Sequence, residues 1–155
     1  MKLACVYLIG VGPGDPDLIS VRALRHLKTA DVIVYDSLIH RRLLQSTHPE
    51  AEQIDVSSTV SGSLKQDEIN LLLVKKFHEG KTVARLKLGD PFIFGSGWQE
   101  ALFLEEQGVP FEVIPVSLCP LEHRVTQAFL SLTLTPEMRF SFCVVLKAKL
   151  PPSRK

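Results

Sequence analysis

Residues 3–16 read LACVYLIGVGPGDP, and residues 82–97 read TVARLKLGDPFIFGSG. In both stretches a strand-like run of mainly apolar residues passes directly into a loop that is rich in glycine and proline. Glycine at the carboxyl end of a strand lets the backbone adopt a positive φ and lets a ligand approach the main chain without meeting a Cβ atom. In open α/β sheets the ligand crevice usually lies at that end of the strands. The two loops therefore predict one binding site, provided that both strands belong to the same sheet.

The first 115 residues continue to alternate between short apolar runs and amphipathic segments. Strands are predicted at residues 3–9, 32–35, 53–56, 82–88 and 111–114, and helices at residues 20–28, 41–46, 66–79 and 98–107. Each crossover is long enough to bring the chain back to the same edge of a sheet. We therefore predict an α/β fold in which a mostly parallel sheet is flanked by helices on both faces.

This alternation degrades after Pro115. Residues 116–120 show no clear period, and strands are only weakly indicated at residues 129–134 and 140–146. The segment is too short to form a second domain with its own core. We therefore predict one domain over residues 1–115, followed by a divergent segment over residues 116–155.

The composition is that of an ordinary globular protein, with 45% hydrophobic and 23% charged residues and a net charge of +1. So small a net charge creates no broad field that would steer the chain to nucleic acid or to an anionic membrane. We expect neither as a partner. The amino-terminal apolar run meets Gly10 too soon for a signal peptide or a membrane-spanning helix, so the expected location is the cytoplasm.

The cysteines and histidines show no spacing typical of a metal site. Cys5, Cys119 and Cys143 are odd in number and widely scattered, which also argues against a disulfide framework. The five histidines are not paired with one another or with cysteine at ligand spacing. We therefore predict reduced thiols and no bound metal.

Neither glycine loop matches a standard phosphate-binding motif. The first lacks the lysine and the following serine or threonine with which a P-loop holds phosphate and magnesium. It also departs from the dinucleotide fingerprint, because Pro13 interrupts it and no third glycine stands at the required offset. A single loop of this kind is typical of a tight turn, and only the pair favours a ligand site.

Two aspartates at the ends of predicted strands each have two interpretations. Asp36 follows the second strand, where its carboxylate would act as a general base in the crevice or would cap the next helix or turn. Asp90 lies in the second loop, where it would cap backbone amides or accept from an amine or hydroxyl group of a ligand. The spacing alone leaves both alternatives open.

Four blocks of this sequence, in order, resemble the tetrapyrrole methylases, and most closely the members that methylate uroporphyrinogen III. The blocks read VYLIGVGPGDPDLISVRALRHLKTADVIVYDSLI (6–39), QDEIN (66–70), RLKLGDPFIFGSG (85–97) and GVPFEVIP (108–115). Several blocks at matching spacing are far more specific than one glycine pattern. The resemblance covers roughly the part of the chain that is predicted to form the α/β domain.

This resemblance implies a methyltransferase that uses S-adenosylmethionine and releases S-adenosylhomocysteine. The family holds the cofactor folded in a cleft between two α/β domains, and residues 1–115 are similar to the first of them. By resemblance Asp36, in the Tyr35-Asp36 pair, is the proposed catalytic base. The implied cofactor-binding residues are Pro13, Leu88, Gly89, Asp90 and Ile93.

The implied reaction is the C-methylation of uroporphyrinogen III on the route to sirohaem and cobalamin. In that chemistry an electron-rich pyrrole carbon attacks the sulfonium methyl group in line, and a base then removes a proton from the tetrapyrrole. Most of the rate enhancement would come from holding carbon, methyl group and sulfur collinear at near-contact distance. The expected partners are a tetrapyrrole small molecule and, if the second domain were complete, a second copy of the chain in a homodimer.

The sequence also departs from the family pattern. Relatives carry a glycine-lysine pair, whose lysine is the proposed proton donor, where this chain has Ser57-Ser58, and they carry an arginine and a glycine at Ser96 and Trp98. After the last predicted strand they continue with a glycine-isoleucine-threonine segment that touches the cofactor, and residues 116–119 differ from it. We therefore expect residues 116–155 to be a truncated remnant of the second domain. The alternative function is that of an inactive fragment, or of a non-catalytic domain that needs a partner chain to complete the cleft.

Overall fold

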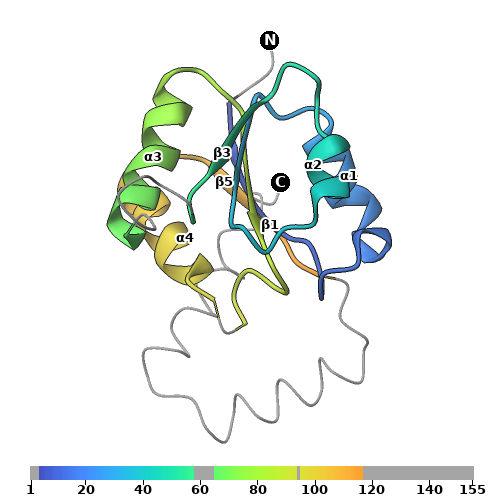
Figure 1. Ribbon diagram of the computed structural model, residues 1–155. Coiled ribbons are helices and arrows are strands. Elements are labelled where there is room, and N and C mark those ends of the chain that lie inside the picture. Colours follow the sequence, from blue (N-terminus) through green and yellow to red (C-terminus); the bar gives the residue numbers. More distant parts are fainter. Residues whose placement is uncertain (1–3, 58–64, 94, 117–155) are drawn as a thin grey trace, which may run out of the picture. The chain divides into compact units, whose positions relative to one another are not determined.

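The computed structural model describes residues 4–57, 65–93 and 95–116. These residues contain a five-stranded sheet in the order β3-β2-β4-β1-β5, in which every neighbouring pair is parallel (Figure 1). The predicted parallel α/β fold is therefore confirmed. The weakly indicated strands at 129–134 and 140–146, and Cys119 and Cys143, lie outside the described residues. The strands are β1 (Val6–Gly10), β2 (Val32–Tyr35), β3 (Glu52–Asp55), β4 (Val83–Lys87) and β5 (Phe111–Ile114).

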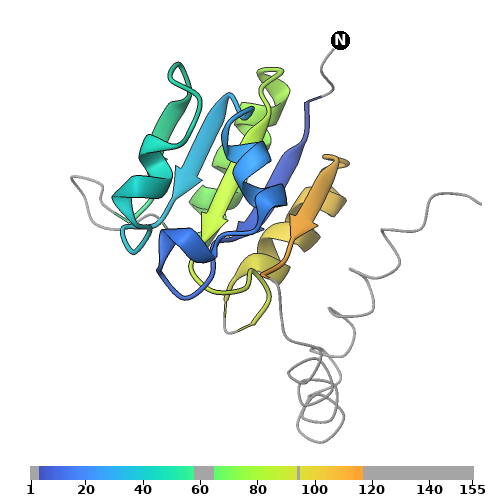
Figure 2. The ribbon, with the colours of Figure 1, turned by 90° about the vertical axis from the view of Figure 1, so that its right-hand side faces the viewer.

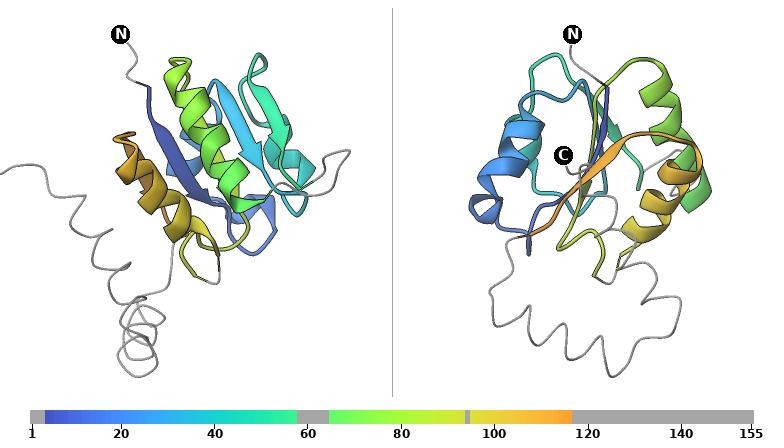
Figure 3. Two further views of the ribbon diagram at one scale, coloured as in Figure 1. Left: turned by 90° about the vertical axis from the view of Figure 1, so that its left-hand side faces the viewer. Right: turned by 180° about the vertical axis from the view of Figure 1, so that it is seen from behind.

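Helices cover both faces of this sheet. Figure 2 shows α1 and α2 in front of one face, and the left view of Figure 3 shows α3 and α4 in front of the other. A short 3₁₀ helix, η1, follows the first glycine loop. None of the helices within the described part of the chain is long and apolar enough to cross a bilayer. The bounds are η1 (Pro16–Leu18), α1 (Val21–Leu27), α2 (Arg41–Gln45), α3 (Gln66–His78) and α4 (Gly97–Glu106).

Local sequence signals set the ends of the helices. The Ser20 hydroxyl caps α1 by accepting from the Ala23 backbone N–H at 3.1 Å. At the start of α3 the Glu68 carboxylate accepts from the Lys65 backbone N–H at 2.8 Å. Gly80 follows α3 with φ +76, a left-handed conformation that stops a helix at little cost only in glycine. These ends fix the points at which the chain re-enters the sheet.

The two faces of the sheet carry two separate apolar layers. Along β2, Val32 and Val34 pack with the residues of α3 and α4, whereas Ile33 packs with those of α1 and α2. Side chains on a strand alternate between faces, so a strand covered on both sides must be apolar at every position. This explains the continuous apolar runs of β1 and β2. It also makes any charged residue in such a strand conspicuous.

A half-buried histidine links α1 to β1, an interior strand of the sheet. The ring of His26 lies over that of Tyr7, with centroids 4.0 Å apart and an interplanar angle of 38°. Burial lowers the pKa of His26 from its ordinary value of 6.5; the carboxylate of Glu112 opposes this shift and the guanidinium of Arg22 adds to it. The folded state therefore disfavours the imidazolium form more than the unfolded chain does.

This shift predicts a loss of stability in acid. The pKa of His26 is lower in the folded than in the unfolded state. Its contribution to the free energy of unfolding is therefore fully present above pH 6.5, and it is lost as the pH falls through the lowered pKa. We expect the free energy of unfolding, measured with urea at about pH 7.5 and about pH 5, to fall less in His26→Gln than in the unaltered protein. The control His78→Gln leaves the Tyr7–His26 pair intact and should keep the full difference. Equal acid sensitivity in His26→Gln and the unaltered protein would contradict this assignment.

Candidate functional site

The two glycine loops meet at the carboxyl edge of the sheet. The backbone N–H of Gly89 donates to the carbonyl of Gly12 at 2.8 Å, and that of Gly12 donates to the carbonyl of Gly89 at 3.4 Å. Both glycines have positive φ, +83 at Gly12 and +68 at Gly89, which makes this close approach possible. β1 and β4 are neighbours in the sheet, so their loops leave from adjacent strand ends. The predicted convergence of the loops is therefore confirmed.

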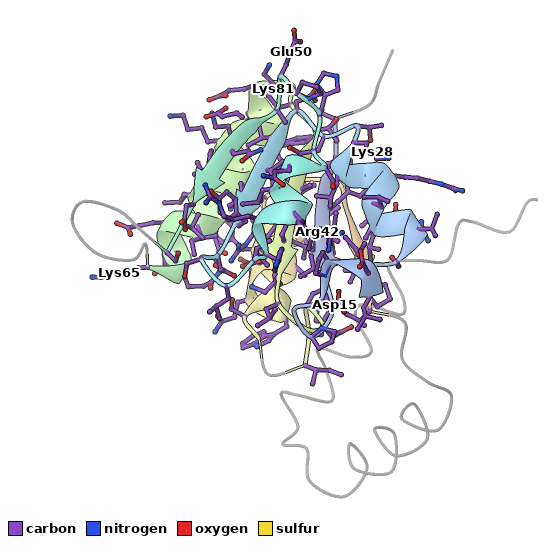
Figure 4. All side chains as sticks on the ribbon, turned by 45° about the vertical axis from the view of Figure 1, so that its right-hand side comes forward. Asp15, Lys28, Arg42, Glu50, Lys65 and Lys81 are labelled. Carbon is purple, nitrogen blue, oxygen red and sulfur yellow. The ribbon has the colours of Figure 1, made fainter. Side chains whose placement is uncertain are left out.

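The joined loops, residues 10–14 and 88–93, present several apolar side chains to solvent. Pro13 is exposed, and Leu88 and Ile93 are exposed by 39% and 38%. Figure 4 shows the labelled Asp15, which follows the first loop, at the opposite end of the sheet from Glu50 and Lys81. This combination of open apolar side chains and tightly turned backbone is the arrangement expected at the mouth of a small-molecule site.

Asp90 is occupied by backbone groups. Its Oδ1 accepts from the Phe92 N–H at 2.9 Å and its Oδ2 accepts from the Val116 N–H at 3.3 Å. The second of these bonds joins the loop after β4 to the chain just beyond β5. Of the two interpretations of Asp90, the structure therefore shows the capping one, in which the carboxylate shapes the loop.

Asp36 takes part in an ion pair. Both of its carboxylate oxygens accept from Nη2 of Arg85, at 2.9 and 3.2 Å, and its side chain is 34% exposed. The cap of α2 is His40, whose Nδ1 accepts from the Arg42 N–H at 3.2 Å. The capping interpretation of Asp36 is therefore not the one that the structure shows. The carboxylate remains partly open to solvent at the edge where the loops meet.

Ser57 stands where the family resemblance implies glycine followed by lysine. Its hydroxyl donates to Oδ1 of Asp55 at 2.5 Å and accepts from the backbone N–H of Ser37 at 2.8 Å. The serine thus links the end of β3 to the residue that follows Asp36. The lysine that is the proposed proton donor of relatives corresponds to Ser58 of this sequence, which lies outside the described residues.

A group of charged side chains that was not predicted from the sequence lies buried next to Asp36. We name Asp36, Arg85, Lys87 and Glu100 the buried charge cluster. The side chains of Arg85, Lys87 and Glu100 are exposed by only 2%, 7% and 0%. Arg85 and Lys87 are alternate residues of β4 and share the parity of the apolar Val83, which packs with α3 and α4. Two cations at alternate positions of an otherwise apolar strand, and therefore on the same face of it, are the sequence signal from which the cluster could have been predicted.

Glu100 is the centre of the buried charge cluster. Its Oε1 accepts from Lys87 Nζ at 2.9 Å, Gln66 Nε2 at 3.2 Å and Arg85 Nε at 3.3 Å. Lys87 Nζ also donates to the hydroxyl of Ser96 at 2.9 Å. The two cations balance the two carboxylates, as buried charges require. Among the described residues, no group that could hold a metal ion is present.

Together the parallel sheet, the joined loops and the partly exposed carboxylate define an α/β protein of the class whose ligand crevice usually lies at the carboxyl edge of the strands. The comparisons with known proteins make this class specific. Residues 5–117 match the family of tetrapyrrole (corrin/porphyrin) methylases. The chain belongs to this family.

Named relatives are identical to this chain at about half of the aligned positions. The uroporphyrinogen-III C-methyltransferases of Methanocaldococcus jannaschii and Bacillus subtilis are 51% and 48% identical over 111 residues, which are 71% of this chain. The siroheme synthase of Hahella chejuensis is 50% identical over the same length. The chain covers only 46%, 43% and 24% of these three relatives, respectively.

Solved structures agree with this assignment. A uroporphyrin-III C-methyltransferase from Thermus thermophilus, complexed with S-adenosylhomocysteine, superposes with a TM-score of 0.62 at 42% identity. The match covers 73% of this chain and 45% of that one. A cobalt precorrin-4 methyltransferase superposes with a TM-score of 0.65 at 35% identity, over 72% of this chain and 45% of that one.

Proposed function

We propose that this chain binds S-adenosylmethionine at the joined glycine loops and serves the C-methylation of uroporphyrinogen III. The observation that carries the proposal is the hydrogen-bonded contact between Gly12 and Gly89, because it turns two separate loops into one mouth. The relative solved with S-adenosylhomocysteine supports the choice of cofactor. Tetrapyrrole methylation in sirohaem and cobalamin biosynthesis is the activity that the named relatives support.

The residues at the mouth fit a nucleoside ligand. A Cβ placed on Gly89 would have no neighbouring atom within 4 Å, so the backbone there is open on its outer side. Leu88, Ile93 and Pro13 offer apolar contacts beside it. Asp90 would act through the loop that its carboxylate holds, since both oxygens already accept from backbone amides. We propose these five residues as the cofactor-binding set.

The chain's own contribution to the reaction would be binding, orientation and proton removal. S-adenosylmethionine, when bound, supplies the electrophilic methyl group. The joined loops would hold it in one orientation, and orientation accounts for much of the rate of such a transfer. We propose that a carboxylate oxygen of Asp36 accepts the proton that the tetrapyrrole loses, because this side chain is partly open at the same edge of the sheet.

Isothermal titration of the full chain with S-adenosylhomocysteine tests the cofactor proposal. We expect saturable heat with one ligand per chain, and an absence of heat would refute binding. Formation of methylated uroporphyrinogen III, followed by mass spectrometry, tests catalysis separately. Binding without methylation would favour the alternative function, a domain that needs a partner chain to complete the cleft. The partial coverage of the relatives is the observation behind that alternative.

Substitution of Gly89 gives a sharper test of where the ligand binds. Alanine at a φ of +68 is strained by roughly 1–2 kcal/mol, and relief of that strain would turn the Gly89 carbonyl and N–H away from their present directions. We expect Gly89→Ala to weaken S-adenosylhomocysteine binding about tenfold in the titration, which corresponds to about 1.4 kcal/mol. The matched control is Gly80→Ala, at φ +76 and also without a neighbour within 4 Å, which lies after α3. Equal affinities of the two variants would place the ligand elsewhere.

Three further features are proposed for the protein as a whole. We propose a cytoplasmic location, no nucleic-acid or membrane partner, and a homodimer if the chain carries a complete second domain. We propose residues 1–115 as the first methylase domain and residues 116–155 as a divergent, truncated remnant of the second. Sedimentation equilibrium tests the dimer on a form of the chain with a complete second domain: a monomer mass at all concentrations would contradict it.

A further inference from the structure

We propose that Arg85 is a positioning residue for Asp36, and that Glu100 holds Arg85 in the conformation this requires. The inference rests on the proposed function, because it assigns a role within the same reaction. The proposed function gives a role to Asp36 but none to the other three members of the buried charge cluster, Arg85, Lys87 and Glu100.

The location of the cluster is costly for folding. Positions 85 and 87 of β4 face the layer formed by α3 and α4, where Val83 is apolar and fully buried. Moving an ion from water into such a layer carries a large desolvation penalty, and apolar residues of similar size are often at least as stabilising there. Ordinary packing therefore does not account for a buried arginine and a buried lysine at the functional edge of the sheet.

The hydrogen bonds of Arg85 fix its guanidinium on three sides. Nε donates to Oε1 of Glu100 at 3.3 Å, Nη1 donates to the Leu86 carbonyl at 3.1 Å, and Nη2 donates to both oxygens of Asp36. A planar guanidinium held at Nε and Nη1 has no rotational freedom left for Nη2. The position of Nη2 therefore decides which orientation the Asp36 carboxylate adopts.

Glu100 also connects Asp36 to the loop that follows β4. Lys87 donates both to Glu100 and to Ser96, the residue that precedes α4. The first residue of α4, Gly97, donates its backbone N–H to the Pro91 carbonyl at 3.1 Å. The buried carboxylate of Glu100 thus accepts from Arg85, which contacts the proposed proton acceptor, and from Lys87, which contacts the end of the proposed cofactor loop. This arrangement suits a reaction in which the two must keep a fixed separation.

The free oxygen of Glu100 provides a conservative variant. Oε2 is buried and has no hydrogen-bond partner among the residues that the structure describes. In Glu100→Gln the amide oxygen can take the place of Oε1 with its three donors, and the amide nitrogen can take the place of Oε2. Glu100→Gln therefore retains the shape of the contact and removes its charge, whereas Glu100→Leu removes both.

The first experiment measures hydrogen exchange of the arginine Nε–H groups by nitrogen-15 NMR on the full chain. We expect the Arg85 Nε–H to exchange at least about tenfold more slowly than that of Arg22, whose ion pair with Glu112 is exposed. Asp36→Asn and Glu100→Gln should retain this protection, and Glu100→Leu should abolish it. Equal exchange at Arg85 and Arg22 in the unaltered protein, or full protection in Glu100→Leu, would overturn the proposal that Glu100 holds Arg85.

The second experiment measures the side-chain rotamer of Asp36 from three-bond NMR couplings. We expect one rotamer in the unaltered protein and in Glu100→Gln, and averaging over several rotamers in Arg85→Lys, which keeps the charge but loses the planar fork. The control Arg22→Lys makes the same change outside the cluster and should keep one rotamer. A single Asp36 rotamer in folded Arg85→Lys would refute the positioning role. If Arg85→Lys does not fold, Glu100→Leu is measured in its place, with the same expected averaging.

The kinetic consequence separates this inference from the proposed function. In methylation assays Arg85→Lys should lower kcat about tenfold or more and leave KM within about twofold, because the substrate still meets a carboxylate that is only poorly oriented. If the unaltered protein shows neither cofactor binding nor methylation, the proposed function fails while the two NMR measurements still decide the positioning role. If it methylates and Arg85→Lys retains full kcat, the positioning role fails and the proposed function stands.

Discussion

Replacement of Gly97 by alanine is expected to lower the free energy of unfolding by about 3 kcal/mol. A Cβ atom at this position would lie 2.1 Å from the Pro91 carbonyl oxygen and 2.8 Å from the Pro91 carbonyl carbon. These are backbone atoms, and they belong to the loop that meets Gly12. The loop must therefore move away from α4 to admit the methyl group. Urea unfolding followed by circular dichroism measures the change.

Helix propensity alone predicts the opposite sign for this substitution. Gly97 is the first residue of α4, and alanine in a helix is favoured over glycine by up to about 1 kcal/mol. Gly80→Ala is a suitable control, because it removes a glycine of φ +76 without any clash and should cost only roughly 1–2 kcal/mol. A stabilised Gly97→Ala variant would show that the loop and the helix do not pack as the structure has them.

Arg85→Met is expected to destabilise the protein by about 3–5 kcal/mol. Methionine fills a similar volume, but it leaves Asp36 without Arg85 and leaves Lys87 as the one cation paired with Glu100 among the residues that the structure describes. The buried carboxylate then carries an uncompensated part of its desolvation penalty. Urea unfolding at neutral pH measures the loss.

Two comparisons make this prediction specific to the buried charge cluster. Arg22→Met removes a cation whose ion pair with Glu112 is exposed, and it should cost at most about 1 kcal/mol. The double variant Arg85→Met/Glu100→Gln leaves one carboxylate and one cation in the cluster. It should therefore be more stable than the sum of the two single changes by more than about 0.5 kcal/mol. Additive changes, or similar losses from Arg85→Met and Arg22→Met, would contradict the structure.

The fold could be predicted from the sequence because its signals are local. The apolar run of β2 matches the predicted strand at residues 32–35, and β5 matches the predicted strand at residues 111–114. Serine, glycine and acidic residues at the expected offsets set the helix ends within a residue or two. The short helix η1 was not predicted, because its three residues are too few to show a period.

The convergence of the loops could be predicted, whereas the partner of Asp36 could not. Each glycine loop carries its own local signal, and adjacent parallel strands bring their carboxyl ends together. The Asp36–Arg85 ion pair instead depends on the register between β2 and β4, which pairs Tyr35 with Leu86. No local pattern gives that register over 49 residues of separation. Glu100 could not be predicted for the same reason, because its contact with β4 depends on how α4 packs on the sheet.

The strand order has a consequence for how the protein is made on the ribosome. β1 lies between β4 and β5. Of the five strands of this sheet it is synthesised before the others, and both of its neighbours follow in the later part of the sheet. Until residue 87 has emerged, the hydrophobic strand Val6–Gly10 has two free edges and no partner. The pairing of β1 with β4 and β5 must then bring together residues that are far apart in the sequence. Such non-local pairing slows folding, so the apolar strand stays exposed for longer. Nascent chains that stop between residues 57 and 83 should therefore be bound by a holdase chaperone, and those that extend past residue 114 should be released from it.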